Sequence, residues 1–143
     1  MICSFIGHRD TPNTIRETLH QTLCKLIENE CVDCFYVGHQ GDFDRLVYLE
    51  LRELQKIYHN IQYRVVLAYY NHTREKCEFE EGETLYPFGL ESVPCRYAIS
   101  RRNRWLVAQS EFLVAYVNRE FGNAADILQV ATRKGIKILN LAK

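Results

Sequence analysis

The stretch from Arg96 to Val117 reads RYAISRRNRWLVAQSEFLVAYV, and it joins an unusual helix to the most apolar strand of the sequence. At about 100° per residue, one face of the helix predicted over 99–110 gathers both apolar and polar side chains. They are Ile99, Asn103, Leu106, Val107 and Ser110, with Arg102 at the edge of the face. Because an unpaired buried polar group costs roughly 1–3 kcal/mol, the inward amide and guanidinium need partners, from the protein or from a ligand.

The run that follows the helix, Phe112 to Val117, shows no alternation of apolar and polar residues. Such a run is typical of a strand that is buried on both faces, as the strands of a parallel sheet are. We therefore expect an α/β fold in which this strand is central.

Short apolar runs and amphipathic segments alternate along the rest of the chain. Further strands are expected at 1–6, 34–37, 64–68 and 137–140, with helices from Pro12 to about Asn29, after Asp42, and from about Ala124 to Lys134. Thr11 and Asp42 are the expected N-caps. With right-handed crossovers, this order predicts a Rossmann-like three-layer sandwich with a five-stranded, mainly parallel sheet. We expect the strand order 3-2-1-4-5.

The chain of 143 residues has the length of one domain. Within it, 69–97 breaks the alternation and is expected to form a long irregular insertion or lid that covers part of the sheet or the site. This segment carries an acidic patch of Glu78, Glu80, Glu81 and Glu83.

Composition narrows the classes of function. Lys plus Arg and Asp plus Glu number 18 each, so no overall field attracts nucleic acid or an anionic membrane. No run approaches the roughly 20 apolar residues of a membrane span. Six cysteines without a leader segment are typical of reduced thiols, so we expect a soluble, cytoplasmic protein. Cys31 and Cys34 form a CxxC pair without further ligands nearby, and we predict neither a metal nor a cofactor.

The expected strand order places a ligand site outside the carboxyl ends of the strands, where the direction of winding reverses. Three loops meet there, at 7–9, 38–44 and 118–123, and the helix N-termini behind them suit a phosphate. The predicted ligand-binding residues are Gly7, His8, Arg9, Gly38, Gly41, Asp44, Arg102, Asn103, Gly122 and Asn123.

Some of these residues also have a structural interpretation. Arg102 could pair with a carboxylate at the rim of the core, and Asn103 could hold a neighbouring loop. Asp44 lies in the first turn of its helix, where the helix dipole alone favours a carboxylate. Arg101 and Arg104 face away from the site, towards solvent or an oligomer contact.

Three blocks, CSFIGHR at 3–9, VGHQGDFD at 37–44 and the stretch 96–117, resemble the YpsA-like branch of the SLOG superfamily. That superfamily groups the DNA-uptake Smf/DprA proteins with the LOG cytokinin-activating enzymes on a Rossmann-like fold. The resemblance implies a nucleotide, nucleotide-sugar or ADP-ribose-like ligand, and a tendency to form homodimers through helices. The outward Trp105, with Arg101 and Arg104, is the expected contact.

The resemblance also provides candidates for catalysis. LOG enzymes remove ribose 5'-phosphate from a base with an arginine before the fourth strand and a glutamate after a glycine-rich turn. The arginine falls on Arg102, whereas the turn is reduced here to EFGNAAD at 120–126. Gly122 is its one remaining glycine, and Asp126 stands where the glutamate would be. The cradle for a phosphate is thus weakened.

Three classes of function follow. The first is a domain that binds or senses a nucleotide-derived small molecule, and the reduced turn favours it. The second is a LOG-like nucleoside 5'-monophosphate phosphoribohydrolase. The third is a scaffold or nucleic-acid-binding module, against which the balanced charge argues.

Overall fold

Six parallel strands form one sheet in the order β4-β3-β2-β1-β5-β6. The structure, a computed structural model, describes residues 1–69, 79–80 and 82–142. The strands are β1 (Ile2–Gly7), β2 (Cys34–Val37), β3 (Gln62–Val66), β4 (Thr84–Leu85), β5 (Phe112–Tyr116) and β6 (Lys137–Asn140). The predicted parallel α/β fold is confirmed, and the predicted order holds for the five strands other than β4.

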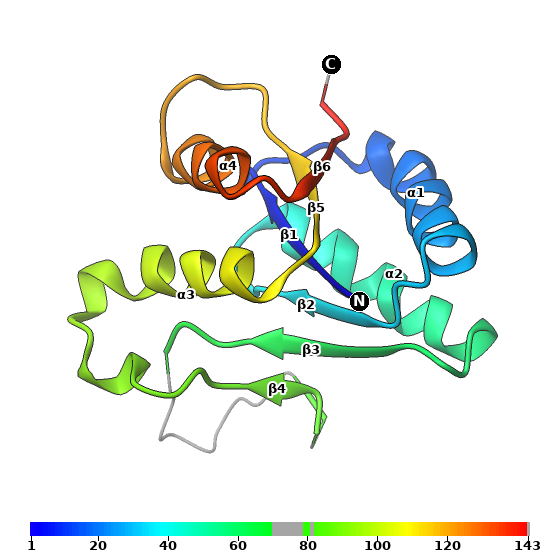
Figure 1. Ribbon diagram of the computed structural model, residues 1–143, viewed down its shortest axis with the longest axis horizontal. Coiled ribbons are helices and arrows are strands. Elements are labelled where there is room, and N and C mark those ends of the chain that lie inside the picture. The colour runs from blue at the N-terminus through cyan, green and yellow to red at the C-terminus, as the bar shows by residue number, and fades with distance from the viewer. Residues whose placement is uncertain (70–78, 81, 143) are drawn as a thin grey trace.

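In the described part of the chain, four helices cover the two faces of the sheet (Figure 1). They are α1 (Arg16–Asn29), α2 (Asp42–Ile57), α3 (Cys95–Gln109) and α4 (Asn123–Lys134). The buried residues of α1 and α2 pack with β1, β2 and β3 in the larger core, and α4 packs with β5 in a smaller one. α3 contacts α4 and β1 on that second face. The molecule is therefore a three-layer sandwich, as predicted.

The central position predicted for the most apolar strand is confirmed. β5 pairs with β1 on one side and β6 on the other, and Phe112, Leu113, Val114 and Ala115 are buried. A strand inside a parallel sheet is covered by helices on both faces, which explains why it shows no alternation.

The prediction of five strands was wrong by one, because the segment 69–97 is not irregular throughout. Its residues Thr84 and Leu85 form β4, which pairs with β3 at the edge of the sheet. A short 3-10 turn, η3 (Leu90–Ser92), follows. A strand of two residues is too short to show a period in the sequence. The predicted acidic residues Glu78 and Glu81 lie outside the described residues.

Three predicted helix starts also need correction. Thr11 does not cap a helix: its hydroxyl donates to the carbonyl of His8 at 2.6 Å, and a 3-10 turn, η1 (Asn13–Ile15), precedes α1. Gly41, not Asp42, is the N-cap of α2. α3 begins at Cys95, directly after Pro94, which is about one turn before the predicted start at Ile99.

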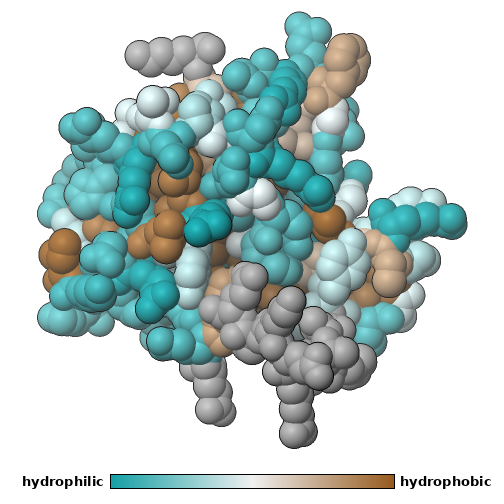
Figure 2. Space-filling view, turned by 180° about the vertical axis from the view of Figure 1, so that it is seen from behind, coloured by the Kyte–Doolittle hydropathy of each residue, from teal (hydrophilic) through white to brown (hydrophobic). Residues whose placement is uncertain are grey.

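Hydrophilic side chains dominate the face seen from behind, where hydrophobic residues form only small patches (Figure 2). None of the helices in the described residues combines the length and the apolar character needed to cross a membrane.

Candidate functional site

A cavity of about 280 Å³ opens at the carboxyl ends of β1 and β5, between the loops that follow them. We name it the switch-point cavity, because the chain winds in opposite directions from these two neighbouring strands. Most of the predicted ligand residues line it, namely Gly7, His8, Arg9, Asp44, Arg102, Asn103, Gly122 and Asn123. The predicted switch point is therefore a real hollow in the fold.

A second cavity, of about 470 Å³, lies on the other side of the loop 38–44, and we name it the side cavity. It contains the remaining predicted residues, Gly38 and Gly41, together with Tyr48 and Phe79. Asp44 lines both cavities. The structure thus divides the predicted residues between two neighbouring hollows.

Two of the predicted glycines are required by close packing. A Cβ on Gly7 would lie 2.3 Å from the ring of Phe43, and one on Gly38 would lie 2.8 Å from Asp44 Oδ2 and 2.9 Å from Arg102 Cζ. Gly122 differs, because it has φ +107° and open space around it. It starts α4 in a conformation that residues with a side chain rarely adopt.

Arg102 is buried and ties three segments together. Its Nε donates to Asn103 Oδ1 at 2.8 Å, its Nη1 to the carbonyl of Val66 at 2.9 Å, and its Nη2 to the Gln40 side chain. The guanidinium therefore connects α3 to the end of β3 and to the loop after β2. Burial lowers the pKa of Arg102, while the nearby carboxylate of Asp44 opposes this shift.

Asp44 is a buried carboxyl in the first turn of α2. Its Oδ2 accepts a hydrogen bond from the backbone amide of Gln40 at 3.0 Å. Burial raises the pKa of Asp44 to about 6, although Arg102 and the Gln40 amide favour the charged form. A carboxyl that titrates near neutral pH beside a cavity can hold or release a proton there.

His8 joins the loops that follow β1 and β5. Its Nε2 accepts the backbone N–H of Asn118 at 3.0 Å, and its ring meets that of Tyr116 edge to face at 6.2 Å between centroids. Burial lowers the pKa of His8, and the charge of Arg119 lowers it further. These two contacts hold the His8 ring between the loops, so His8 fixes the shape of this end of the cavity.

The open side of the switch-point cavity carries positive charge. Arg9 and Arg119 line it, and Arg119 Nη2 bonds both oxygens of Asp10 at 2.8 and 2.7 Å. This contact lowers the pKa of Asp10. Beside them α4 begins at Asn123 without a side-chain cap among the described residues, so its first amides face outward. Arginines and free helix amides are the groups that bind phosphate in proteins.

Only some residues of the turn at 120–126, which resembles a reduced LOG motif, line the switch-point cavity. Asn123 is exposed and lines the switch-point cavity. Asp126, the candidate acid, is exposed one turn into α4 and is not part of the lining. Gln40, Ile99, Arg119 and Phe121 line the cavity without having been predicted. Gln40, Arg119 and Phe121 lie in loops, where no periodicity marks them, whereas the helical period placed Ile99 on the inward face of its helix without assigning it to the site.

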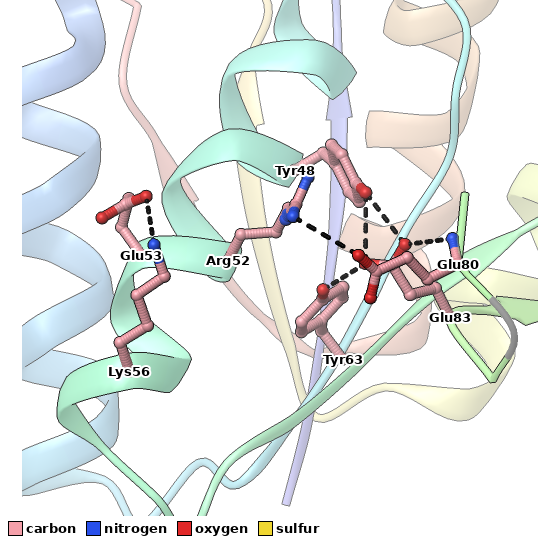
Figure 3. Close-up of polar contacts among 7 residues, drawn as sticks. All are labelled: Tyr48, Arg52, Glu53, Lys56, Tyr63, Glu80 and Glu83. Carbon is pink, nitrogen blue, oxygen red and sulfur yellow. Dashed lines mark hydrogen bonds and ion pairs between the residues drawn. The ribbon is translucent and has the colours of Figure 1, made fainter. Parts of the chain in front are cut away.

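A buried carboxylate near the side cavity fastens β4 to the body of the protein (Figure 3). Glu83 accepts hydrogen bonds from Tyr63, from Tyr48 at 3.0 Å and from the Glu80 amide at 2.6 Å. Burial opposes the charge, but these bonds outweigh it, and the pKa of Glu83 is lowered. Tyr48 belongs to α2 and lines the side cavity, so this cluster connects the insertion to that cavity.

Among the described residues, no group of three or more histidine, cysteine, aspartate or glutamate side chains is placed to hold a metal ion. Cys31 and Cys34 are free thiols, as are Cys3, Cys24 and Cys95. No cofactor site is therefore assigned.

Comparison with known protein-family models found no match for this sequence, and a search of curated proteins found no relative. The resemblance to the SLOG superfamily stays a prediction. The function of the site is therefore inferred from its own geometry.

Proposed function

We propose that the protein binds or senses a nucleotide-derived small molecule, such as a nucleotide, a nucleotide-sugar or an ADP-ribose-like compound, in the switch-point cavity. The single observation that carries this proposal is the charge of the lining, where three arginines (Arg9, Arg102 and Arg119) exceed the one lining carboxyl group, Asp44, and the carboxylate of Asp10 that pairs with Arg119. A ligand with phosphate groups neutralises this excess.

The phosphate is expected at the open side of the cavity. Arg9 and Arg119 are exposed, and the uncapped N-terminus of α4 adds free amides and the positive end of a helix dipole. Arg102 uses three of its donors within the protein, so its contribution to a ligand is mainly its charge. The predicted relationship to SLOG proteins supports the same class of ligand.

Binding without turnover is our first choice because Asp126, which corresponds to the LOG glutamate, is exposed and outside the cavity lining. The turn before α4 also keeps one glycine, Gly122, and therefore matches the glycine-rich turn of the LOG enzymes only in part.

A LOG-like phosphoribohydrolase is the second candidate, and one observation favours it. Asp44 is a buried carboxyl with a pKa of about 6, the kind of group that serves as a general acid or base at neutral pH. In this alternative, Asp44 takes the role that the sequence suggested for Asp126. Hydrolysis of AMP near the median enzymatic rate of about 10 per second, abolished by Asp44→Asn, would promote this candidate.

Native mass spectrometry of the freshly purified protein tests the proposal directly. We expect a co-purifying adduct with the mass of a nucleotide or nucleotide-sugar, or one that appears when AMP or ADP-ribose is added. The absence of any adduct with a panel of nucleotides at millimolar concentration would contradict the proposal.

We also propose that the protein acts in the cytoplasm and does not bind nucleic acid. The described cysteines are free thiols, and the 18 basic and 18 acidic residues balance.

A further inference from the structure

Three side chains between α1 and α2 form a chain of hydrogen bonds outside both cavities. Cys24 Sγ lies 3.6 Å from His20 Nε2, and His20 Nδ1 bonds Oε1 of Glu50. His20 and Cys24 are one turn apart on α1, so the helix itself holds them on the same face. Glu50 reaches them from α2.

The order of these groups is that of an activated nucleophile: a thiol, a base within hydrogen-bonding reach, and an acidic group that orients the base. Glu50 is 5% exposed and also accepts a hydrogen bond from Arg16 Nε at 3.3 Å, so its position is fixed. Because its carboxylate accepts from Nδ1–H, Nε2 of His20 is the nitrogen that can receive the thiol proton. The imidazolium that forms would lie against the carboxylate.

Cys24 packs in part against the larger core and is otherwise accessible to a reagent. Its side chain is half-buried, while His20 is 46% exposed. Tyr58 lies beside the thiol and donates its hydroxyl to Glu28 at 2.7 Å; this bond, followed by the contact with Cys24, raises the pKa of the phenol. Tyr58 therefore stays neutral and adds no negative charge next to a thiolate. By contrast, burial raises the pKa of Cys3, which keeps that thiol unreactive.

We propose that Cys24 is a site of reversible modification by small disulfides, with His20 as its base and Glu50 as the residue that positions His20. The Cys24 proton passes to His20 Nε2, and the thiolate attacks one sulfur of the disulfide R–S–S–R. A Cys24–S–S–R bond forms as the original S–S bond breaks, and the departing thiolate takes the proton from His20. Cys24 is oxidised, one half of the reagent is reduced to a thiol, and no other oxidant is needed. This inference does not depend on the proposed ligand of the switch-point cavity.

The test uses the folded full chain and oxidised glutathione at pH 7, with the rate of mixed-disulfide formation at each cysteine read by mass spectrometry of acid-quenched peptides. Cys31 and Cys95 are internal controls: both are more exposed, and neither thiol bonds a histidine in the described part of the chain. We expect Cys24 to react at least about tenfold faster than either control.

His20→Gln should slow Cys24 about tenfold or more and leave Cys31 and Cys95 unchanged. Glu50→Gln should slow Cys24 as well. Equal rates at Cys24 and the two controls, or a rate at Cys24 that His20→Gln does not change, would overturn the proposal. The comparison of Cys24 with Cys31 and Cys95 in the parent protein needs no variant and serves if a substitution impairs folding.

Discussion

Arg102 both lines the switch-point cavity and holds three segments in place. The sequence predicted that this guanidinium needs partners but left open whether they come from the protein or from a ligand. In the structure Asn103, Val66 and Gln40 accept its hydrogen bonds. The stability of the loop after β2 therefore depends on a residue of α3, far away in the chain.

Replacing Arg102 by alanine should lower the free energy of unfolding by about 3–5 kcal/mol. The reason is that the change leaves the Val66 carbonyl, Gln40 and the buried Asp44 without their positive partner. Urea unfolding followed by circular dichroism measures the loss. Arg104→Ala, an exposed position on the opposite face of α3, is the control and should change stability by less than about 0.5 kcal/mol. Equal stability of the two variants would show that Arg102 is not a structural clamp.

Asp44 should make the protein less stable as the pH rises. Burial raises its pKa in the folded protein from the ordinary value of 3.8 to about 6, so the native state binds more protons than the unfolded state between these values. The free energy of unfolding then falls with increasing pH across about pH 4–6 and is level above. From this difference in pKa, the free energy of unfolding should fall by roughly 3 kcal/mol in total across this range. The measurement is the difference in unfolding free energy between the parent and Asp44→Asn from pH 4 to 8. A difference that stays constant over this range would refute the raised pKa of Asp44.

The role of a single residue could be predicted where it depends on residues nearby in the sequence. It was missed where the contacts come from distant parts of the chain. Gly7 and Gly38 were predicted as ligand-binding glycines of strand-to-helix turns, yet their close contacts are Phe43 and Arg102, which later elements bring to them. Arg119 was not predicted, because an exposed loop arginine looks the same in the sequence whether or not a cavity lies beside it.

At the scale of elements, the attachment of β4 depends on one buried carboxylate. Glu83 lies next to β4 and accepts hydrogen bonds from α2 and β3 through Tyr48 and Tyr63 (Figure 3). The backbone of this segment also accepts the amides of Val65 and Leu67, at 2.6 and 2.8 Å. The short strand is therefore held by side chains as much as by its ladder.

Glu83→Ala should loosen this edge of the sheet without unfolding the domain. Hydrogen bonds to a charged group contribute about 1.5–3 kcal/mol each, so exchange of the Val65 and Leu67 amides should accelerate roughly ten- to hundredfold. Hydrogen exchange read by NMR measures it. Glu53→Ala is the matched control. Glu53 lies on α2, the helix that carries Tyr48, but it pairs with Lys56 on the exposed side (Figure 3). Unchanged exchange in Glu83→Ala would contradict the role given to this carboxylate.

The five expected strands were predicted to within two residues, and the largest error is β3, which was predicted at 64–68 and is Gln62–Val66. β2 and β6 have the predicted bounds, and α4 ends at Lys134 as expected, where Gly135 takes a left-handed conformation. The predicted start of α1 was wrong because a 3-10 turn follows Pro12. In the sequence, such a turn looks the same as the first turn of an α-helix.

At the scale of the whole molecule, the parallel sheet and its order could be predicted because alternating strands and helices with right-handed crossovers allow few arrangements. The position of the cavity follows from that order. Its lining does not, since it depends on how side chains from three loops and α3 fill the space between strand ends. The two hollows either side of 38–44 could not be separated from the sequence.

The homodimer stays a prediction, but the structure does not support the contact through Trp105 on which it was partly based. Trp105 does not point freely outward: it is half-buried and packs against Tyr36, with 5.5 Å between ring centroids. Arg101 and Arg104 are exposed, as predicted. Sedimentation at tens of micromolar should give twice the chain mass of 16.9 kDa, and Arg104→Glu should shift the equilibrium toward the monomer. A species of 16.9 kDa for the parent protein would refute the prediction.

The central claim is that the switch-point cavity binds a phosphate-bearing nucleotide, and calorimetric titration of three proteins with AMP tests it most directly. The parent should bind, and Arg119→Ala should bind roughly 10- to 150-fold more weakly, because a hydrogen bond to a charged group contributes about 1.5–3 kcal/mol. Arg133→Ala, an exposed position in the last turn of α4, should match the parent. Equal affinity for AMP in all three proteins, or no binding by the parent, would contradict the claim.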